Sequence, residues 1–344
     1  MRATHRKDFA VWHRAIHNNR QHFGGRSLSA SIVDEHTPVL VGEALAALAL
    51  QAGGYYVDAT YGRGGHTALI LQALGREGRV LAIDRDPQAI AAGHERFADE
   101  VRLTLVHASF ADLRTLVPAH AHGRECGGVL FDLGVSSPQL DNPTRGFSFR
   151  SDGPLDMRMD PTRGEPVSAW LARASVDEIR EVISTLGEER FARRIAEAIV
   201  NTRAAHPLTR TNELASLVSR AVRTREPGKH PATRTFQALR MFINDELGQL
   251  ERGLSAALDV LGVAGRLAVI SFHSLEDREV KNFMKRESQL DPVFLDLPAV
   301  PEGVEPRLRL IGRKSRPSEA EIERNPRARS ALLRVAERTE ARHG

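Results

Sequence analysis

Short apolar runs alternate with amphipathic stretches along the chain from residue 36 onward. Runs that are apolar throughout are typical of strands buried on both faces of a parallel sheet. The pattern therefore predicts an α/β fold, with helices on both faces of a mostly parallel sheet. The five main strands are expected at Tyr55–Tyr61, Arg79–Asp84, Arg102–Ala108, Gly128–Leu133 and Gly265–Phe272.

Helical periodicity fills the gaps between these strands. The first helix is expected at Gly65–Leu74. The next should begin at Asp86-Pro87, since Asp is a good N-cap and Pro suits the first helical position. Three late elements follow the fifth strand. They are a strand, a helix and a strand, at Pro306–Gly312, Ser318–Arg324 and Ser330–Ala336.

Between the fourth and fifth strands the pattern is helical only. A capping box, Ser175-Val-Asp-Glu178, marks the start of the first helix there. A single long helix from Thr233 to Leu261 should return the chain to the sheet. We therefore expect an all-helical insertion at residues 142–232, which divides the sheet domain into 33–141 and 233–344. The three predicted helices of the insertion are Ser175–Leu186, Glu189–Ala204 and Thr211–Thr224.

Composition excludes several classes of protein. No apolar run approaches the roughly 18 residues of a membrane span. The single cysteine, Cys126, excludes a disulfide framework and a cysteine-ligated zinc site, and it fits a reducing compartment. A net charge of +4 hints at an anionic partner. The excess of arginine over lysine suits RNA, because arginine pairs bidentately with phosphate, but a genome rich in G and C would produce the same excess.

Residues 1–32 differ from the rest of the chain. They are basic, contain one acid, Asp8, and have no apolar core of a secretory signal. We expect a basic extension without fixed structure. An arm that touches RNA, a dispensable tail, a product of start-codon choice and an organelle transit peptide are all compatible with this composition.

The stretch "VDATYGRGGHTALIL" places a glycine-rich turn between a strand and a helix. A dinucleotide fingerprint would need a third glycine where Thr67 stands, and a P-loop would need a lysine that is not there. The second strand ends at Asp84, about 20 residues beyond Gly64, where a carboxylate typically accepts hydrogen bonds from a ribose. A nucleoside without a pyrophosphate, such as S-adenosylmethionine (SAM), fits best. A dinucleotide and a purely structural turn are the alternatives.

The fourth strand leads into a second polar turn. "FDLGVSSPQLD" places Asp132 near the end of the strand and then Ser136-Ser137-Pro138-Gln139. In methyltransferases that act on exocyclic amines, a polar residue with prolines lies at this place, and its oxygens accept hydrogen bonds from the amine. The match is loose, since there is one proline and no aromatic residue after it.

Several long motifs resemble the ribosomal RNA small-subunit methyltransferase H family. They include "HTPVLVGEAL", "YGRGGHTALIL", "RGFSFRSDGPLDMRMD", "HPATRTFQALRMFINDEL" and "ISFHSLEDREVK", and the resemblance runs from His36 to about Ala341. It implies a Rossmann-like SAM-dependent methyltransferase fold, with 33–141 and 233–344 as the cofactor domain and 142–232 as the substrate-recognition domain. It also implies N4-methylation of a cytidine in the decoding (P-site) region of bacterial 16S rRNA.

The family's cofactor contacts can be carried over residue by residue. Phe110 would then pack on adenine, although a purely structural core position is the alternative. His66 would contact the cofactor through its backbone, or not at all. Asp132 is ambiguous, because it could hold the cofactor or orient the amine. The implied cofactor contacts are Gly64, Gly65, His66, Asp84, Phe110, Asp132 and Gln139. The candidate catalytic residues of the amine-facing turn are Asp132, Ser136, Ser137 and Pro138.

Two further places could touch the substrate. Asp156 and Arg158 lie in the charged segment "RSDGPLDMRMD", which either positions the substrate or is a solvated loop. His273 in "SFHSLED" either lines the substrate side of the site or caps the helix that begins near Ser274. No cluster of histidines and acids has the spacing of a metal site.

The expected partner is 16S rRNA within the small ribosomal subunit, in the cytoplasm. Neither a membrane nor DNA is expected as a partner, and a homodimer is left open. Cytosine would have to leave its RNA stack to reach the methyl group. A SAM-sensing, RNA-binding ribosome assembly factor without significant turnover is the alternative function.

Overall fold

The computed structural model describes residues 38–222, 228, 230–290, 292–294 and 305–340. The predicted basic extension, 1–32, lies outside the described residues. Within the described ranges, every helix is too short or too polar to span a bilayer.

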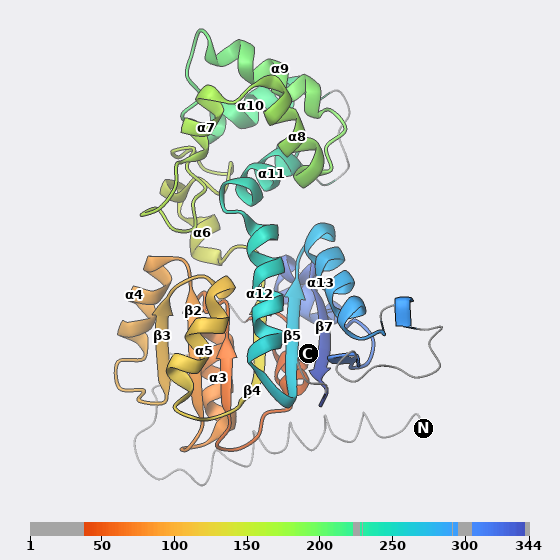
Figure 1. Cartoon of the computed structure of the whole chain (residues 1–344). Coiled ribbons are helices and arrows are strands. Elements are labelled where there is room, and N and C mark those ends of the chain that lie inside the picture. The colour runs from red at the N-terminus through yellow and green to blue at the C-terminus, as the bar shows by residue number, and fades with distance from the viewer. Residues whose placement is uncertain (1–37, 223–227, 229, 291, 295–304, 341–344) are drawn as a thin grey trace. The chain divides into compact units, whose positions relative to one another are not determined.

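One sheet of seven strands organises the chain, in the order β3-β2-β1-β4-β5-β7-β6 (Figure 1). Strands β1 to β5 are parallel, and β7 runs antiparallel to both β5 and β6. β4 follows β3 in sequence but lies on the other side of β1. The order in which strands are added to the sheet therefore reverses between β1 and β4. Ligands of such sheets bind at this point, beyond the carboxyl ends of the strands. The strands are β1 (Tyr55–Asp58), β2 (Arg79–Asp84), β3 (Leu103–His107), β4 (Cys126–Asp132), β5 (Leu261–Ser271), β6 (Leu308–Leu310) and β7 (Leu332–Arg338).

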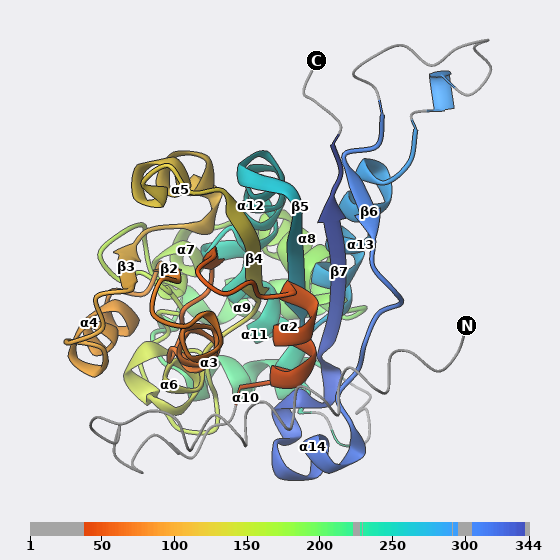
Figure 2. The same cartoon turned by 90° about the horizontal axis from the view of Figure 1, so that it is seen from below.

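Helices cover both faces of this sheet, as Figure 2 shows end-on. On one face, apolar side chains of α5, α12 and α13 bury the strands, with Val117, Leu254 and Phe283 among them. On the other face, α2 and α3 do the same through residues such as Leu45 and Ile70. This Rossmann-like architecture confirms the predicted fold class. The covering helices are α2 (Val41–Leu48), α3 (Gly65–Leu74), α4 (Pro87–Arg96), α5 (Leu113–Ala121), α12 (Glu246–Val260) and α13 (Ser274–Glu287).

The segment between β4 and β5 contains helices and, in the described residues, no strand of the sheet. These helices share a separate apolar core, in which Trp170, Ile183 and Leu239 are buried. The predicted capping box is confirmed, since Ser175 and Glu178 exchange two hydrogen bonds at the start of α8. The helices are α6 (Ser137–Asp141), α7 (Val167–Arg173), α8 (Val176–Gly187), α9 (Ala192–Arg203), α10 (Thr211–Ala221) and α11 (Thr233–Ile243).

The prediction of one long helix from Thr233 to Leu261 is wrong. The helix breaks at Asn244 and Asp245, and Asp245 adopts a left-handed conformation with φ of 49°. The buried Asn244 side chain donates to the Met157 carbonyl at 2.7 Å and accepts from the Met159 amide at 2.8 Å. The break therefore satisfies the backbone of a distant loop, which helical periodicity cannot reveal.

Other predicted elements are confirmed with small shifts. β1 ends three residues earlier than expected, because Ala59–Tyr61 already belong to the turn, and β5 begins earlier, at Leu261. The predicted N-cap at Asp86 is present, where the carboxylate accepts from the Gln88 amide at 3.0 Å. The late helix is α14 (Glu319–Arg324), between β6 and β7.

Candidate active site

The glycine turn after β1 leaves no room for a side chain at Gly64 or Gly65. Gly62 and Gly64 have φ of 55° and 70°, a region that L side chains rarely adopt. A Cβ on Gly64 would lie 2.5 Å from the Tyr61 ring, and one on Gly65 would lie 2.3 Å from Pro38. The turn therefore presents backbone groups, rather than side chains, to whatever binds beyond β1.

Asp84, at the end of β2, lies directly against this turn. Its Oδ2 accepts from the Gly62 amide at 2.7 Å, and its Oδ1 accepts from the Asp86 amide at 2.8 Å. Burial raises the pKa of Asp84 to about 6, although the two amide hydrogen bonds oppose the rise. Each carboxylate oxygen has a second lone pair, so the group can still accept from two ribose hydroxyls. Its position is the one predicted for a ribose contact.

Asp58, the last residue of β1, is a buried carboxylate that the sequence did not single out. It is 1% exposed. Thr67 donates to its Oδ2 at 2.6 Å, and the Thr60 amide donates to its Oδ1 at 3.2 Å. Burial raises the pKa of Asp58, and the hydrogen bond from Thr67 counteracts part of this. Thr67 stands where a dinucleotide fingerprint would have its third glycine, and here it anchors Asp58.

His66 and Asp132 meet between the ends of β1 and β4. His66 Nε2 lies 3.4 Å from Asp132 Oδ2, and the His66 side chain is 6% exposed. The prediction considered only the backbone of His66, yet its buried imidazole is brought against the candidate catalytic carboxylate. The backbone of Asp132 is also fixed, because its amide donates to Thr60 Oγ1 at 2.6 Å.

The predicted amine-facing turn lies beside the glycine turn. A Cβ on Gly62 would lie 4.0 Å from the Ser136 Cβ. Both ends of the Gln139 amide are engaged, because Oε1 accepts from the Ser136 amide and Nε2 donates to Asp86 Oδ2, each at 2.9 Å. The structure therefore places Gln139 as a brace between two turns, and its predicted cofactor contact remains a prediction.

Ser137 has a structural partner of its own. Its hydroxyl accepts from Arg327 Nη1 at 2.5 Å, and Arg327 Nη2 lies 2.6 Å from the Asp141 carboxylate. One arginine from the end of the chain thus ties down both ends of the short helix α6. Among the candidate catalytic residues, Asp132 carries a carboxylate that is 25% exposed in its side chain and whose buried Oδ1 makes no hydrogen bond in the described residues.

Phe110 follows β3, as predicted, and is partly buried. Its ring meets Phe131 edge to face, with ring centroids 5.3 Å apart. A Cβ on Gly253 of α12 would lie 2.5 Å from the Phe110 ring. Part of the ring is therefore committed to the core, and only its exposed part could pack on a base.

The charged segment that contains Asp156 and Arg158 is folded by its own ion pair. Asp156 accepts two hydrogen bonds from the Arg158 guanidinium, at 2.7 and 2.8 Å. A Cβ on Gly146 would lie 2.2 Å from the Pro154 carbonyl, and one on Gly153 would lie 1.8 Å from the Pro143 carbonyl. The glycines thus allow a tight crossing of two chain segments. A contact of Asp156 or Arg158 with substrate remains a prediction.

Sequence reasoning did not single out Arg145, which links separate segments next to the candidate site. This buried side chain donates to Asp86 Oδ2 at 2.7 Å and to the Met159 carbonyl at 2.9 Å. It joins the turn after β2 to the loop that Asn244 also holds. No signal in a chain with so many arginines distinguishes this one before folding.

His273 caps α13, which was one of its two predicted roles. Its Nδ1 accepts from the Glu276 amide at 3.4 Å, and its Nε2 lies 3.0 Å from Glu276 Oε1. Together with Glu246, these residues form a group with the spacing of a metal site, within 4.8 Å. Sequence reasoning missed the group because it joins α12 and α13. Arg240 already donates two hydrogen bonds of 2.7 Å to Glu246, so the charge of that carboxylate is balanced by a guanidinium.

Comparison with known proteins gives a consistent picture. The proteins called ribosomal RNA small subunit methyltransferase H from Halorhodospira halophila and Dechloromonas aromatica are each 56% identical to this chain over 304 residues. These matches cover 88% of this chain and 94% and 98% of the relatives. The protein of the same name from Coxiella burnetii is 49% identical over 306 residues, 89% of this chain and 99% of that relative. A model of the MraW methylase family matches residues 34–339, and the chain belongs to that family.

Proposed function

We propose that this chain transfers the methyl group of SAM to N4 of a cytidine in the decoding region of bacterial 16S rRNA. Family membership supports methyl transfer to small-subunit rRNA. One observation carries the finer proposal: a glycine turn, a ribose-type carboxylate and a partly exposed carboxylate meet at the carboxyl ends of β1, β2 and β4. These residues are Gly62–Gly65, Asp84 and Asp132.

The described residues fit the proposed cofactor. Asp84 would accept from the ribose hydroxyls, and the backbone of Gly64 and Gly65 would follow the methionine part. The exposed part of Phe110 would pack on adenine. SAM supplies a methyl group activated by a sulfonium, so this chemistry asks the protein for alignment and for a proton acceptor.

The target amine sets the remaining task. The N4 lone pair of cytosine is delocalised into the ring, so N4 must be aligned behind the methyl group. The carboxylate of Asp132 is 25% exposed in its side chain, and its buried Oδ1 has no hydrogen-bond partner in the described part of the chain. It can therefore accept a hydrogen bond from the amine and draw its lone pair toward the methyl. Ser136 and Pro138 belong to the amine-facing turn that follows β4, and they would shape the pocket around the base.

The partner that we propose is the assembled small subunit. Its target cytidine would leave the base stack to enter the active site. Residues 142–232 would then recognise the substrate. A SAM-sensing assembly factor without turnover is the alternative, and the partly exposed carboxylate of Asp132 favours catalysis over it. Transfer of tritiated methyl from SAM to undermethylated small subunits tests the proposal. Subunits that bind the protein but acquire no label would favour the assembly factor.

Cys126→Ser should keep nearly full activity, and the product should be N4-methylcytidine. Methylation at C5 would require a cysteine thiolate that adds to the ring. Cys126 is the chain's single cysteine, is 2% exposed and begins β4, whereas Asp132 ends that strand. A strand of this length separates them by about 20 Å. Burial also raises the pKa of Cys126 to about 12, so the thiolate hardly forms.

Chromatography of the labelled nucleosides against N4-methyl and C5-methyl standards reads out this prediction. Cys126→Ala serves as a second variant, because it places no hydroxyl in the core. A C5-methyl product, or loss of activity in both variants with the fold intact, would contradict the assignment.

Subunit binding should become less sensitive to salt when exposed arginines of the helical segment are removed. Phosphate binding by arginine releases counterions, so removing one phosphate-binding arginine should lower the slope of log affinity against log salt by about 0.7. Arg194 and Arg220 are exposed and suit this test. Arg203 does not, because it donates to the Leu171 and Ala174 carbonyls within the fold. Arg223 and Arg225 lie outside the described residues.

The double variant Arg194→Gln, Arg220→Gln should be compared with Arg76→Gln, Arg313→Gln. The control pair lies outside the helical segment and is also exposed. Point variants are preferable to deletion of 142–232, because Arg145 of that segment binds both Asp86 in the turn after β2 and the Met159 carbonyl. An unchanged salt slope in the first pair would remove these two arginines from the recognition surface.

A further inference from the structure

The His66 imidazole is buried without a hydrogen-bond partner at the proposed reaction centre. The residue is 5% exposed, and neither ring nitrogen makes a hydrogen bond within the described residues. The nearest acceptor is Asp132 Oδ2, 3.4 Å from Nε2 but outside hydrogen-bond geometry. Buried polar groups are almost always satisfied, so an orphaned pair of this kind calls for a functional reason.

Two carboxylates face the imidazole, Asp132 from β4 and Asp58 from β1. Both oxygens of Asp58 already accept a hydrogen bond, from Thr60 and Thr67, whereas the buried Oδ1 of Asp132 has no partner in the described chain. Burial alone lowers the pKa of His66, but Asp132 and then Asp58 raise it by more. The imidazolium is therefore favoured beside Asp132.

We infer that His66 is the positioning residue for Asp132: its imidazole, 3.4 Å from Oδ2, fixes the orientation in which the partly exposed carboxylate meets the amine of the substrate. This inference rests on the proposed function. It assigns a role to the side chain of His66, where sequence reasoning considered only the backbone. A carboxylate whose orientation is fixed from one side accepts hydrogen bonds from a narrow range of directions, and this directs the amine.

The reaction gives the Asp132 carboxylate its task. The N4 lone pair forms the new C–N bond while the C–S bond breaks, and the electron pair of that bond stays on sulfur as the thioether. The methylated nitrogen then carries an extra proton, which passes to the Asp132 carboxylate. The proton leaves to water after product release.

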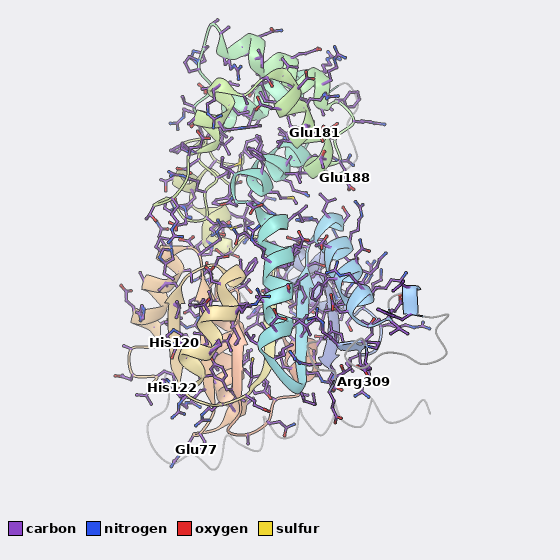
Figure 3. The ribbon with its side chains drawn as sticks, viewed as in Figure 1. Glu77, His120, His122, Glu181, Glu188 and Arg309 are labelled. Atoms are coloured by element: carbon purple, nitrogen blue, oxygen red, sulfur yellow. The ribbon has the colours of Figure 1, made fainter. Side chains whose placement is uncertain are left out.

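His66→Ala should lower the single-turnover rate of methyl transfer by about 10- to 100-fold, the scale of a misplaced catalytic group. SAM affinity, measured by calorimetry, should change far less than the rate. His66→Gln should recover part of the rate, because its amide can donate near the position of Nε2. If His66→Ala is too unstable to assay, His66→Gln against wild type carries the same comparison. His122→Asn is the control, since His122 is exposed and lies beyond α5, ahead of the amino end of β4 (Figure 3).

A double-mutant cycle with Asp132→Asn separates positioning from a merely structural role. If His66 acts through Asp132, the rate of the double variant His66→Ala, Asp132→Asn should equal that of Asp132→Asn alone. Losses that multiply, a wild-type rate in His66→Ala, or a loss confined to SAM affinity would overturn the inference. The wild-type assay distinguishes a failure of the proposed function from a failure of the role assigned to His66. A wild type without methyl transfer contradicts the proposed function, whereas an active wild type with an equally active His66→Ala contradicts only the role of His66.

Discussion

Asp84→Ala should weaken SAM binding by about 2–4 kcal/mol while the fold survives. The carboxylate is held by two backbone amides and is expected to accept two hydrogen bonds from the ribose. Its loss removes those bonds and also frees the Gly62 amide that shapes the glycine turn. Calorimetry measures the affinity, and the melting temperature reports on the fold. An unchanged affinity would remove Asp84 from the cofactor site.

The same residue predicts how wild-type SAM binding depends on pH. Because burial raises the pKa of Asp84 to about 6, the group is ionised at pH 8 and largely protonated at pH 5. Protonation takes away an acceptor, so affinity should fall as the pH drops through about 6. Asp84→Asn cannot titrate and should bind weakly at both pH values. A wild-type affinity that is flat between pH 5 and 8 would show that Asp84 keeps its charge or makes no ribose contact.

Arg145→Met should lower the free energy of unfolding by about 3–5 kcal/mol, the usual cost of leaving one partner of a buried ion pair alone. Arg145 and Asp86 are 7% and 4% exposed in their side chains and lie 2.7 Å apart. The variant also strands the Arg158 and Met159 carbonyls, to which the guanidinium donates. Urea denaturation measures the loss.

Two controls define the cause of that loss. Arg150→Met removes an exposed arginine of the same segment and should change stability little. The double variant Asp86→Asn, Arg145→Met removes the orphaned charge as well, and it should recover part of the stability. A double variant no more stable than Arg145→Met would show that the carbonyl contacts, not the charge of Asp86, account for the effect.

Most secondary structure could be predicted because it depends on local signals. Unbroken apolar runs marked the strands, and Asp86-Pro87 and Ser175 marked helix starts through caps that the structure confirms. The long helix after Thr233 failed for a non-local reason. Asn244 ends it by bonding to backbone groups nearly 90 residues away in sequence.

The candidate site was predicted unevenly. Asp84 and Asp132 were found because they end strands, and parallel strands bring their carboxyl ends to one edge of a sheet. The imidazole of His66 was overlooked, since the helical pattern does not show that its first turn points at β4. Thr67 counted only as a missing glycine, although its hydroxyl holds Asp58.

The sequence by itself determined the fold class, the strands, the glycine turn and the carboxylate that follows it, since each depends on residues close together in the chain. Only the tertiary structure decided which polar and charged groups lie against one another. Arg145 with Asp86, His66 with Asp132 and Asn244 with its loop are pairs from distant segments. Their energies depend on burial and on distances of a few ångström, and those quantities exist only once the chain is folded.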